Sequence, residues 1–288
     1  MMLKQRFFWL LVVVLLALIW GGYNIYSERK ATAPGEEKQR TVREEKEMAE
    51  PGNGEQEAAA AELELQYFGH GAFLLRVGET RFLMDPYDPN CGYGKLDLEA
   101  DYITVSHEHM DHNYIAAASG AKPIRGLSPD GLGWEDVSLS LGGIQIFTIP
   151  TYHDAAAGKL RGRNAVFVFD TGELRLVHLG DLGHLLSPEQ VEKLTPVHVL
   201  LLPVGGHFTI DAAEARQLMD VLAPAVVVPM HYRTEATRNW PIAPLDEFLK
   251  GVEKVPKQKD SVVTISRDTL PQETEIWVME ATAPRRKE

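Results

Sequence analysis

Hydrophobic residues first gather in one run near the N-terminus. The run covers residues 7–26 with only Asn24 polar, and it follows Lys4 and Arg6. A helix needs about 20 apolar residues to cross the hydrocarbon core of a bilayer. A cleaved secretory signal is the alternative, but no convincing small-x-small cleavage site follows the run. Residues 1–27 are therefore predicted to form an uncleaved, single-pass membrane anchor.

The next segment, residues 28–62, has the opposite pattern. It is rich in Glu, Lys, Arg, Ala and Gly, with almost no large apolar residue. Such a segment cannot bury enough surface to fold alone, so a disordered charged linker is predicted. Anchor and linker together predict a protein of the cell membrane, with a cytoplasmic N-terminus and an extracytoplasmic folded domain.

From residue 63 onward, short apolar or alternating segments predict β-strands. The two segments at 197–203 and 225–229 are fully apolar, which is typical of strands buried on both faces. The complete set of predicted strands is 64–68, 72–77, 81–84, 101–106, 144–149, 165–170, 174–179, 197–203, 225–229, 261–266 and 275–279.

Helical spacing of apolar residues is confined to a few segments. It predicts a helix over 211–222, capped by Asp211, a second helix over 244–252, and one or two helical turns over 113–118. Many strands with few amphipathic helices favour an α+β fold, in which two sheets pack face to face and helices flank them. Residues 282–288 are predicted to be a disordered tail.

Composition narrows the chemistry. Hydrophobic residues make up 44% of the chain and charged residues 24%, as in an ordinary folded protein. The formal net charge of −12 argues against a nucleic-acid partner, which needs a basic surface. Cys91 is the only cysteine, so neither an intrachain disulfide nor a Cys-rich zinc module can form. Any metal must be held by histidines and carboxylates.

The six residues from 107 to 112 carry the strongest chemical signal. His107 and His109 alternate on an extended segment directly after a predicted strand, so both rings can point to one place. Asp111 and His112 follow as the chain turns, and they can reach a second place nearby. Imidazole and carboxylate without thiolate suit zinc, iron or manganese. Core packing does not explain this density of histidines, so a metal site is predicted.

Three further candidates each follow an apolar strand. His153 comes after the strand at 144–149, and Asp181 and His231 follow later strands in the same way. Residues at strand ends are exposed to ligands while the strands hold them rigidly. Glu108 is predicted to point away, because its flanking histidines are two residues apart on a loop rather than four apart on a helix.

The ordered pattern His-x-His-x-Asp-His, then a separate His, Asp and His, resembles the metallo-β-lactamase superfamily over residues 64 to 281. The resemblance implies an αββα sandwich of two mixed sheets flanked by helices, and it assigns residues 63–281 to one hydrolase domain. Asp85 matches an acidic position that supports the metal ligands from outside. The implied ligands are His107, His109 and His153 on one metal ion, Asp111, His112 and His231 on the second, and Asp181 bridging both.

Glycine-histidine motifs narrow the resemblance further. The segments 68–74, 179–184 and 203–209 are similar to hydrolases related to ascorbate-6-phosphate lactonase, and more distantly to a phospholipase D that releases N-acylethanolamines. His70 and His184 are candidates for supporting the site or contacting substrate. His207 is a candidate proton donor. Each of these histidines can instead be a hydrogen-bonding turn residue.

The resemblance implies a hydrolase with two divalent metal ions, zinc first, with manganese or iron as alternatives. A hydroxide activated by both ions would cleave an ester, lactone or phosphodiester bond, with Asp111, Asp181 and His207 as catalytic residues. The alternatives are a β-lactamase or phospholipase D-like activity, and a membrane-tethered metal-binding or sensing domain without catalysis. The expected partners are a small-molecule or lipid substrate and the membrane, with no nucleic acid; homo-oligomerisation is left open.

Overall fold

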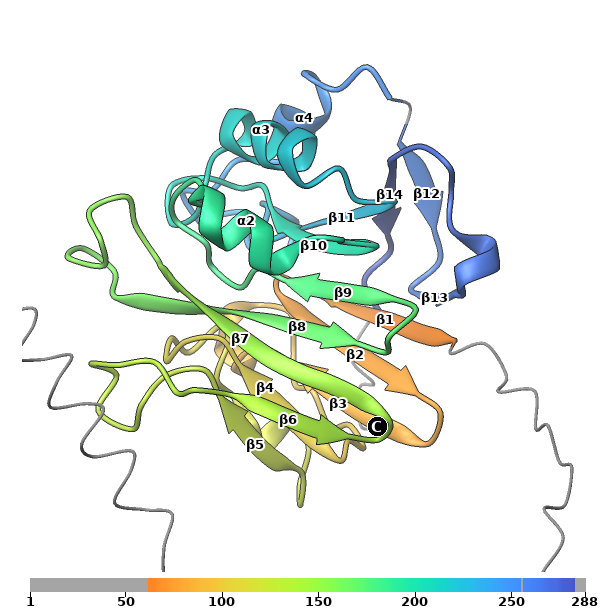
Figure 1. Ribbon diagram of the computed structural model, residues 1–288. Coiled ribbons are helices and arrows are strands. Elements are labelled where there is room, and N and C mark those ends of the chain that lie inside the picture. Colours follow the sequence, from red (N-terminus) through yellow and green to blue (C-terminus); the bar gives the residue numbers. More distant parts are fainter. Residues whose placement is uncertain (1–61, 255, 283–288) are drawn as a thin grey trace, which may run out of the picture. The chain divides into compact units, whose positions relative to one another are not determined.

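The computed structural model describes residues 62–254 and 256–282, which form two β-sheets packed face to face (Figure 1). The six-stranded sheet has the order β13-β1-β2-β3-β4-β5 and the eight-stranded sheet the order β12-β14-β11-β10-β9-β8-β7-β6. The strands of the first are β1 Leu63–Gly69, β2 Ala72–Val77, β3 Thr80–Met84, β4 Tyr102–Val105, β5 Lys122–Arg125 and β13 Val262–Ile265. Those of the second are β6 Ser138–Leu141, β7 Ile144–Tyr152, β8 Arg163–Asp170, β9 Arg175–His178, β10 Val199–Pro203, β11 Val226–Met230, β12 Lys257–Lys259 and β14 Glu275–Met279.

Both sheets mix parallel and antiparallel pairs. Strands β3, β4 and β5 run parallel to one another, and so do β9, β10, β11, β14 and β12. The remaining pairs, such as β1 with β2 and β7 with β8, are antiparallel. Parallel strands end at the same edge of their sheet, so the loops that follow them come together.

The main core lies between the two sheets. Strand β8 shows how period-two alternation builds it: Phe167 and Phe169 belong to the inter-sheet core, while Val166 and Val168 pack on the opposite face. All four side chains are buried, which is why the segment is apolar without a break. The strand is therefore covered on both faces.

The described α-helices cover the outer face of the eight-stranded sheet (Figure 1). They are α2 Pro188–Leu194, α3 Ala212–Leu222 and α4 Leu245–Leu249. Asp211 begins α3 as predicted, accepting from the backbone N–H groups of Ala213 and Glu214. The outer face of the six-stranded sheet is instead packed against loop residues around two 3-10 turns, Pro89–Cys91 and Ile115–Ala117.

The predicted fold class is confirmed: two mixed sheets with few helices form an α+β sandwich. Each predicted strand is present, with ends shifted by at most three residues, and the predicted helix at 244–252 is the shorter α4. The sequence missed three short strands and one helix, namely β5, β6, β12 and α2. The predicted linker at 28–62 and tail at 282–288 lie almost entirely outside the described residues, and the proposed domain limits stay predictions.

The expected location at the cell membrane requires correction. Within residues 62–254 and 256–282, no helix is long and apolar enough to cross a membrane. The segment 1–27, on which the expected anchor rested, lies outside the described residues. The membrane location and the orientation derived from it are therefore not retained.

Candidate metal centre

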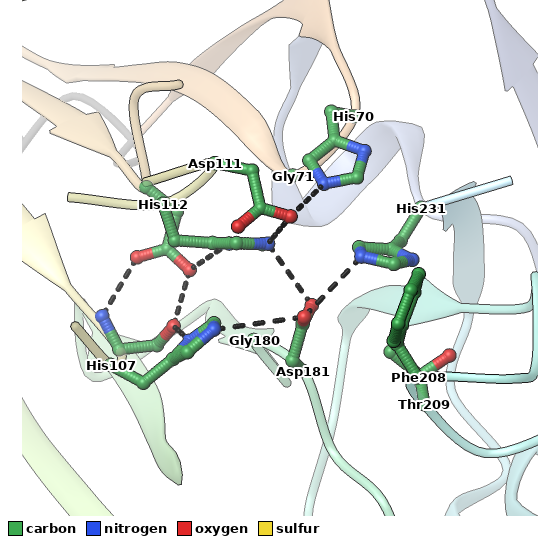
Figure 2. A network of polar contacts seen from close by, with 12 residues as sticks. His70, Gly71, His107, Asp111, His112, Gly180, Asp181, Phe208, Thr209 and His231 are labelled. Atoms are coloured by element: carbon green, nitrogen blue, oxygen red, sulfur yellow. Dashed lines mark hydrogen bonds and ion pairs between the residues drawn. The ribbon is translucent and has the colours of Figure 1, made fainter. Parts of the chain in front are cut away.

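The candidate side chains meet at one edge of the sandwich, where strands of both sheets end (Figure 2). From the six-stranded sheet, β1 leads to His70, β3 to Asp85 and β4 to the run from 107 to 112. From the eight-stranded sheet, β7 leads to His153, β9 to Asp181 and β11 to His231. Segments distant in sequence thus deliver their polar side chains to one place.

Backbone strain is concentrated at these strand ends. His70, Asp85 and His231 each directly follow a strand and have φ values of 54°, 43° and 53°, in the left-handed region that non-glycine residues rarely adopt. The strained turns support one another across the two sheets, because the N–H of His231 donates to the carbonyl oxygen of His70 at 3.1 Å. Such strain persists only where the surrounding structure holds it.

The glycines of the Gly-His motifs make room for the histidines. A Cβ atom on Gly71 would lie 2.8 Å from Cε1 of the His112 ring, and one on Gly183 would lie 2.2 Å from the backbone carbon of His153. Real Cβ contacts are not that short, so larger residues at these positions would displace the imidazoles. The motifs are thus explained by close packing around the site.

Among the described residues there are three groups of potential metal ligands, and one of them, Asp85 with His107 and His112, takes its histidines from the other two. The other two are called the first and the second group. In the first, ring nitrogens of His107, His109 and His153 lie within 4.8 Å of one another. His107 and His153 are buried, whereas His109 faces the solvent. The second group meets the same distance limit and consists of His70, Asp111, His112 and His231.

Asp181 lies between His107 of the first group and His112 and His231 of the second (Figure 2). Its Oδ2 atom is 3.0 Å from Nε2 of His153 and 3.6 Å from Nε2 of His107, both in the first group. The carboxylate also approaches the second group, with Oδ1 3.1 Å from Nε2 of His112 and Oδ2 3.3 Å from Nε2 of His231. A single buried carboxylate therefore faces imidazoles of both groups.

Several buried polar atoms at this place lack a hydrogen-bond partner. Among them are Nε2 of His107, His112 and His231 and Oδ1 of Asp181. An unpaired buried polar atom costs about 1 to 3 kcal/mol, so several of them around one space call for an electrophilic partner. Imidazole nitrogens and carboxylate oxygens are donor atoms that bind divalent transition metals, and these residues therefore fit metal ions.

The outer nitrogens of His112 and His107 are held by the protein. His112 donates from Nδ1 to Oδ2 of Asp85 at 2.9 Å, and His107 donates from Nδ1 to Oγ of Ser106 at 2.9 Å. Ser106 in turn donates its hydroxyl hydrogen and its N–H to the Asp85 carboxylate. Asp85 thus contacts His112 directly and His107 through Ser106, and Ser106 was not among the candidates from the sequence.

The electrostatic environment favours the metal-binding forms of His107 and Asp181, but not that of His112. Burial alone would lower the pKa of His112, but the carboxylates of Asp181 and Asp111 outweigh it and raise that pKa well above the ordinary value, which favours the protonated ring. Burial lowers the pKa of His107 well below its ordinary value, and neighbouring His112 adds to the effect. Burial alone would raise the pKa of Asp181, but the nearby imidazoles, His112 first, outweigh it and hold that pKa well below the ordinary value. Neutral imidazoles and an ionised carboxylate are the forms that bind a metal ion.

The other glycine-flanked histidines lie in different surroundings. His184 accepts at Nε2 from the N–H of Tyr152 at 3.1 Å and donates from Nδ1 to the carbonyl oxygen of Leu185. It thus holds the chain next to His153 and lines a separate groove. His207 is exposed, with a φ of 59°, and the neighbouring Phe208 lines the pocket over the cluster instead. The structure does not bring His207 to the cluster.

Glu108 points away from the histidines, as predicted. Its carboxylate accepts from the side chains of Arg125 and of Asn113 on the exposed side of the loop. A pocket of about 460 Å³ opens over the cluster on the other side, and His109, Asp111, His153 and Asp181 form its floor. The candidate ligands are therefore accessible to a small molecule.

The two-sheet sandwich and the His/Asp cluster at its strand ends are typical of a class of metal-dependent enzymes. Comparisons with known proteins identify that class. The model of the beta-lactamase superfamily domain matches residues 64–231. A UPF0173 metal-dependent hydrolase of Thermococcus onnurineus is 32% identical over 214 residues, covering 66% of this chain and 92% of that protein.

Solved structures agree with this relationship. A proposed Zn-dependent hydrolase of the metallo-β-lactamase superfamily from Thermotoga maritima is 31% identical, with a TM-score of 0.59, covering 76% of this chain and all of that one. A metallo hydrolase from Ignicoccus hospitalis shares the fold, with 24% sequence identity and a TM-score of 0.52. The match covers 76% of this chain and 96% of that one. The chain belongs to the metallo-β-lactamase superfamily and, within it, to the UPF0173 metal-dependent hydrolases.

Proposed function

We propose that this metal-dependent hydrolase uses a dinuclear centre to cleave an ester, lactone or phosphodiester bond. The observation that carries the proposal is the position of Asp181, whose two carboxylate oxygens face imidazoles of both ligand groups. A carboxylate in that position suits a bridge between two cations.

In this proposal each group holds one cation, and Asp181 contacts both. Zinc is the first choice, with manganese or iron as alternatives, because the donor atoms are imidazole nitrogens and carboxylate oxygens. When bound, the cations polarise the scissile group and lower the pKa of a water molecule towards ~7. The first set is His107, His109 and His153, and the second is Asp111, His112 and His231.

The remaining residues position these ligands and shape the pocket. Asp85 and Ser106 fix the rings of His112 and His107, and the carbonyl oxygen of Phe208 accepts from Nδ1 of His153 at 3.0 Å. The pocket volume of about 460 Å³ suits a small-molecule substrate. The role of proton donor is not assigned to His207, because its side chain does not line this pocket.

Metal analysis of the full chain tests the dinuclear proposal. We expect about two ions per wild-type chain and hydrolysis of at least one substrate in a panel of lactones, esters and phosphodiesters. Asp181→Asn, which keeps the side-chain shape but removes the charge, should bind about one ion or none and lose turnover by at least ~100-fold.

Asp170→Asn is the matched control. Asp170 is paired with Arg175 at the far end of β8, outside the cluster, so this variant should retain the wild-type metal content. One ion per wild-type chain under saturating metal would contradict the dinuclear arrangement. Equal metal content in the Asp181→Asn and wild-type chains would remove Asp181 from the ligand set.

A further inference from the structure

The rim of the pocket over the cluster carries exposed apolar side chains. Met110 and Leu160 are large apolar side chains at its mouth that are 53% and 74% exposed. Apolar side chains exposed around a pocket indicate contact with an apolar part of a ligand. The complete rim consists of Met110, Leu160, Arg161, Phe208, Asn239, Trp240 and Pro241.

Arg161 is the cationic member of this rim. Its guanidinium carbon lies 5.6 Å from the centre of the Phe208 ring, a cation–π distance that leaves the N–H groups available. No carboxylate is paired with it among the described residues, whereas Arg125 pairs with Glu108 and Arg175 with Asp170.

The loop that carries Arg161 is fixed by a buried carboxylate. Asp154, only 4% exposed, accepts from the backbone N–H groups of Ala156 and Gly158 at 2.8 and 3.1 Å. Its second oxygen accepts from the N–H groups of Leu160 and Arg161 at 3.0 and 2.8 Å. Asp154 directly follows His153, so the rim is held in a fixed relation to the metal cluster. A preorganised rim loses little entropy when a ligand binds.

We propose that Arg161 selects substrates that carry an anionic group at the end of an apolar arm. The scissile bond of such a substrate lies at the cluster, its arm lies along Leu160, Met110 and Phe208, and its anion pairs with the guanidinium. Arginine binds carboxylate and phosphate groups through parallel N–H hydrogen bonds. This inference rests on the proposed function, because it places the reacting end of the substrate at the metal site.

Two matched hydroxamates test this specificity without requiring turnover. Hexanohydroxamic acid and the monohydroxamate of adipic acid both chelate divalent cations, and they differ only in the carboxylate at the far end of the arm. Suberic monohydroxamate and octanohydroxamic acid form a longer pair. Calorimetric titration of the zinc-loaded full chain should show that the carboxylate form of at least one pair binds about 10- to 100-fold more tightly.

Arg161→Gln should abolish that preference while leaving the affinity for the neutral hydroxamates within about twofold. Arg161→Lys, which keeps the charge but not the planar fork, should retain part of it. Lys159→Gln is the matched control, because it removes a positive charge from the same loop at an exposed residue that does not line the pocket. It should bind all four hydroxamates like the wild-type chain.

The outcomes separate this inference from the proposed function. Tight binding of all hydroxamates, with no preference for a carboxylate in either pair, would overturn the role of Arg161 and leave the metal centre intact. A preference that persists in Arg161→Gln would overturn it too, because the anion would then be bound elsewhere. Failure of every hydroxamate to bind the zinc-loaded chain would contradict the metal site and both proposals with it.

Discussion

His70 differs from the other histidines of the centre in the partner of its ring. Its Nε2 lies 3.0 Å from Oδ2 of Asp111, and its side chain is fully buried. Burial, reinforced by the neighbouring His231, lowers the pKa of His70 to about 4, so the ring is neutral at physiological pH and can donate from Nε2. Burial alone would raise the pKa of Asp111, but His112 and the hydrogen bond from His70 keep it far below its ordinary value. We infer that His70 orients an ionised Asp111.

We predict that His70→Ala weakens binding of one metal ion and spares the other. Loss of an outer hydrogen bond to a ligand typically reduces metal affinity by about 10- to 100-fold. Competition of the full chain with a chelator of known affinity measures both binding steps. His70→Gln, which retains an N–H donor, should recover part of the loss. Unchanged affinity at both steps in His70→Ala would show that Asp111 needs no such donor.

At the residue scale, the sequence identified the histidines and aspartates of the cluster but not all of their supports. The run from 107 to 112 is dense enough to indicate metal chemistry by itself. Ser106 and Asp154 are single polar residues whose roles depend on contacts that no local pattern records. The Gly-His motifs look alike in sequence, yet His70 is buried at the cluster while His207 is exposed. Their different positions depend on tertiary packing.

At the element scale, the strands that build the core were predictable, whereas three of the strands at the sheet edges, β5, β6 and β12, were not. Apolar segments such as β10 and β11 are recognisable because both of their faces are buried. Strand β5 is Lys-Pro-Ile-Arg and β12 is Lys-Gln-Lys, neither of which has a strand-like apolar pattern. These segments become strands because a neighbouring strand offers backbone partners, which is a property of the assembled sheet. Helix α2 was missed, despite its capping box at Ser187, because Val191 and Leu194 are its only large apolar residues.

We predict that the loop between β7 and β8 contributes to the stability of the fold although it has no regular secondary structure. Replacing Asp154 by Ala removes the acceptor of four backbone N–H groups in a buried position. The free energy of unfolding should fall by about 2 to 3 kcal/mol, since hydrogen bonds to a charged group are the stronger kind and their buried donors would lose their partner. Urea denaturation measures the loss, and limited proteolysis should show earlier cleavage within residues 154–162.

Asp130→Ala is the control for that experiment. Asp130 also accepts from a backbone N–H, that of Leu132, but its turn is exposed and water can replace the carboxylate. A loss of no more than about 0.5 to 1 kcal/mol is expected there. Equal losses in the two variants would mean that the carboxylate of Asp154 contributes no more than a surface turn does.

At the scale of the whole domain, the candidate centre joins the two sheets. The run from 107 to 112 follows a strand of the six-stranded sheet, while His153, Asp181 and His231 follow strands of the eight-stranded sheet. Protein contacts already cross this junction: His178 donates from Nε2 to the carbonyl oxygen of Gly71 at 2.9 Å. Cations bound between ligands of both sheets would add to these contacts, so metal binding and sheet association should be thermodynamically linked.

Removal of metal should therefore destabilise the folded chain as a whole. A ligand that binds only the native state stabilises that state by about 2.7 kcal/mol when the free ligand concentration is 100 times the Kd. Chelation of the metal should therefore lower the Tm by several degrees, and added metal should restore the Tm. Asp181→Asn, which is expected to bind fewer ions, should show a smaller shift on chelation than the wild-type chain. Leu75→Ala, which opens a cavity in the inter-sheet core, should cost about 2.7 to 5 kcal/mol whether metal is present or not. A wild-type Tm that does not respond to chelation would show that the two sheets associate without help from the centre, and that metal serves the reaction alone.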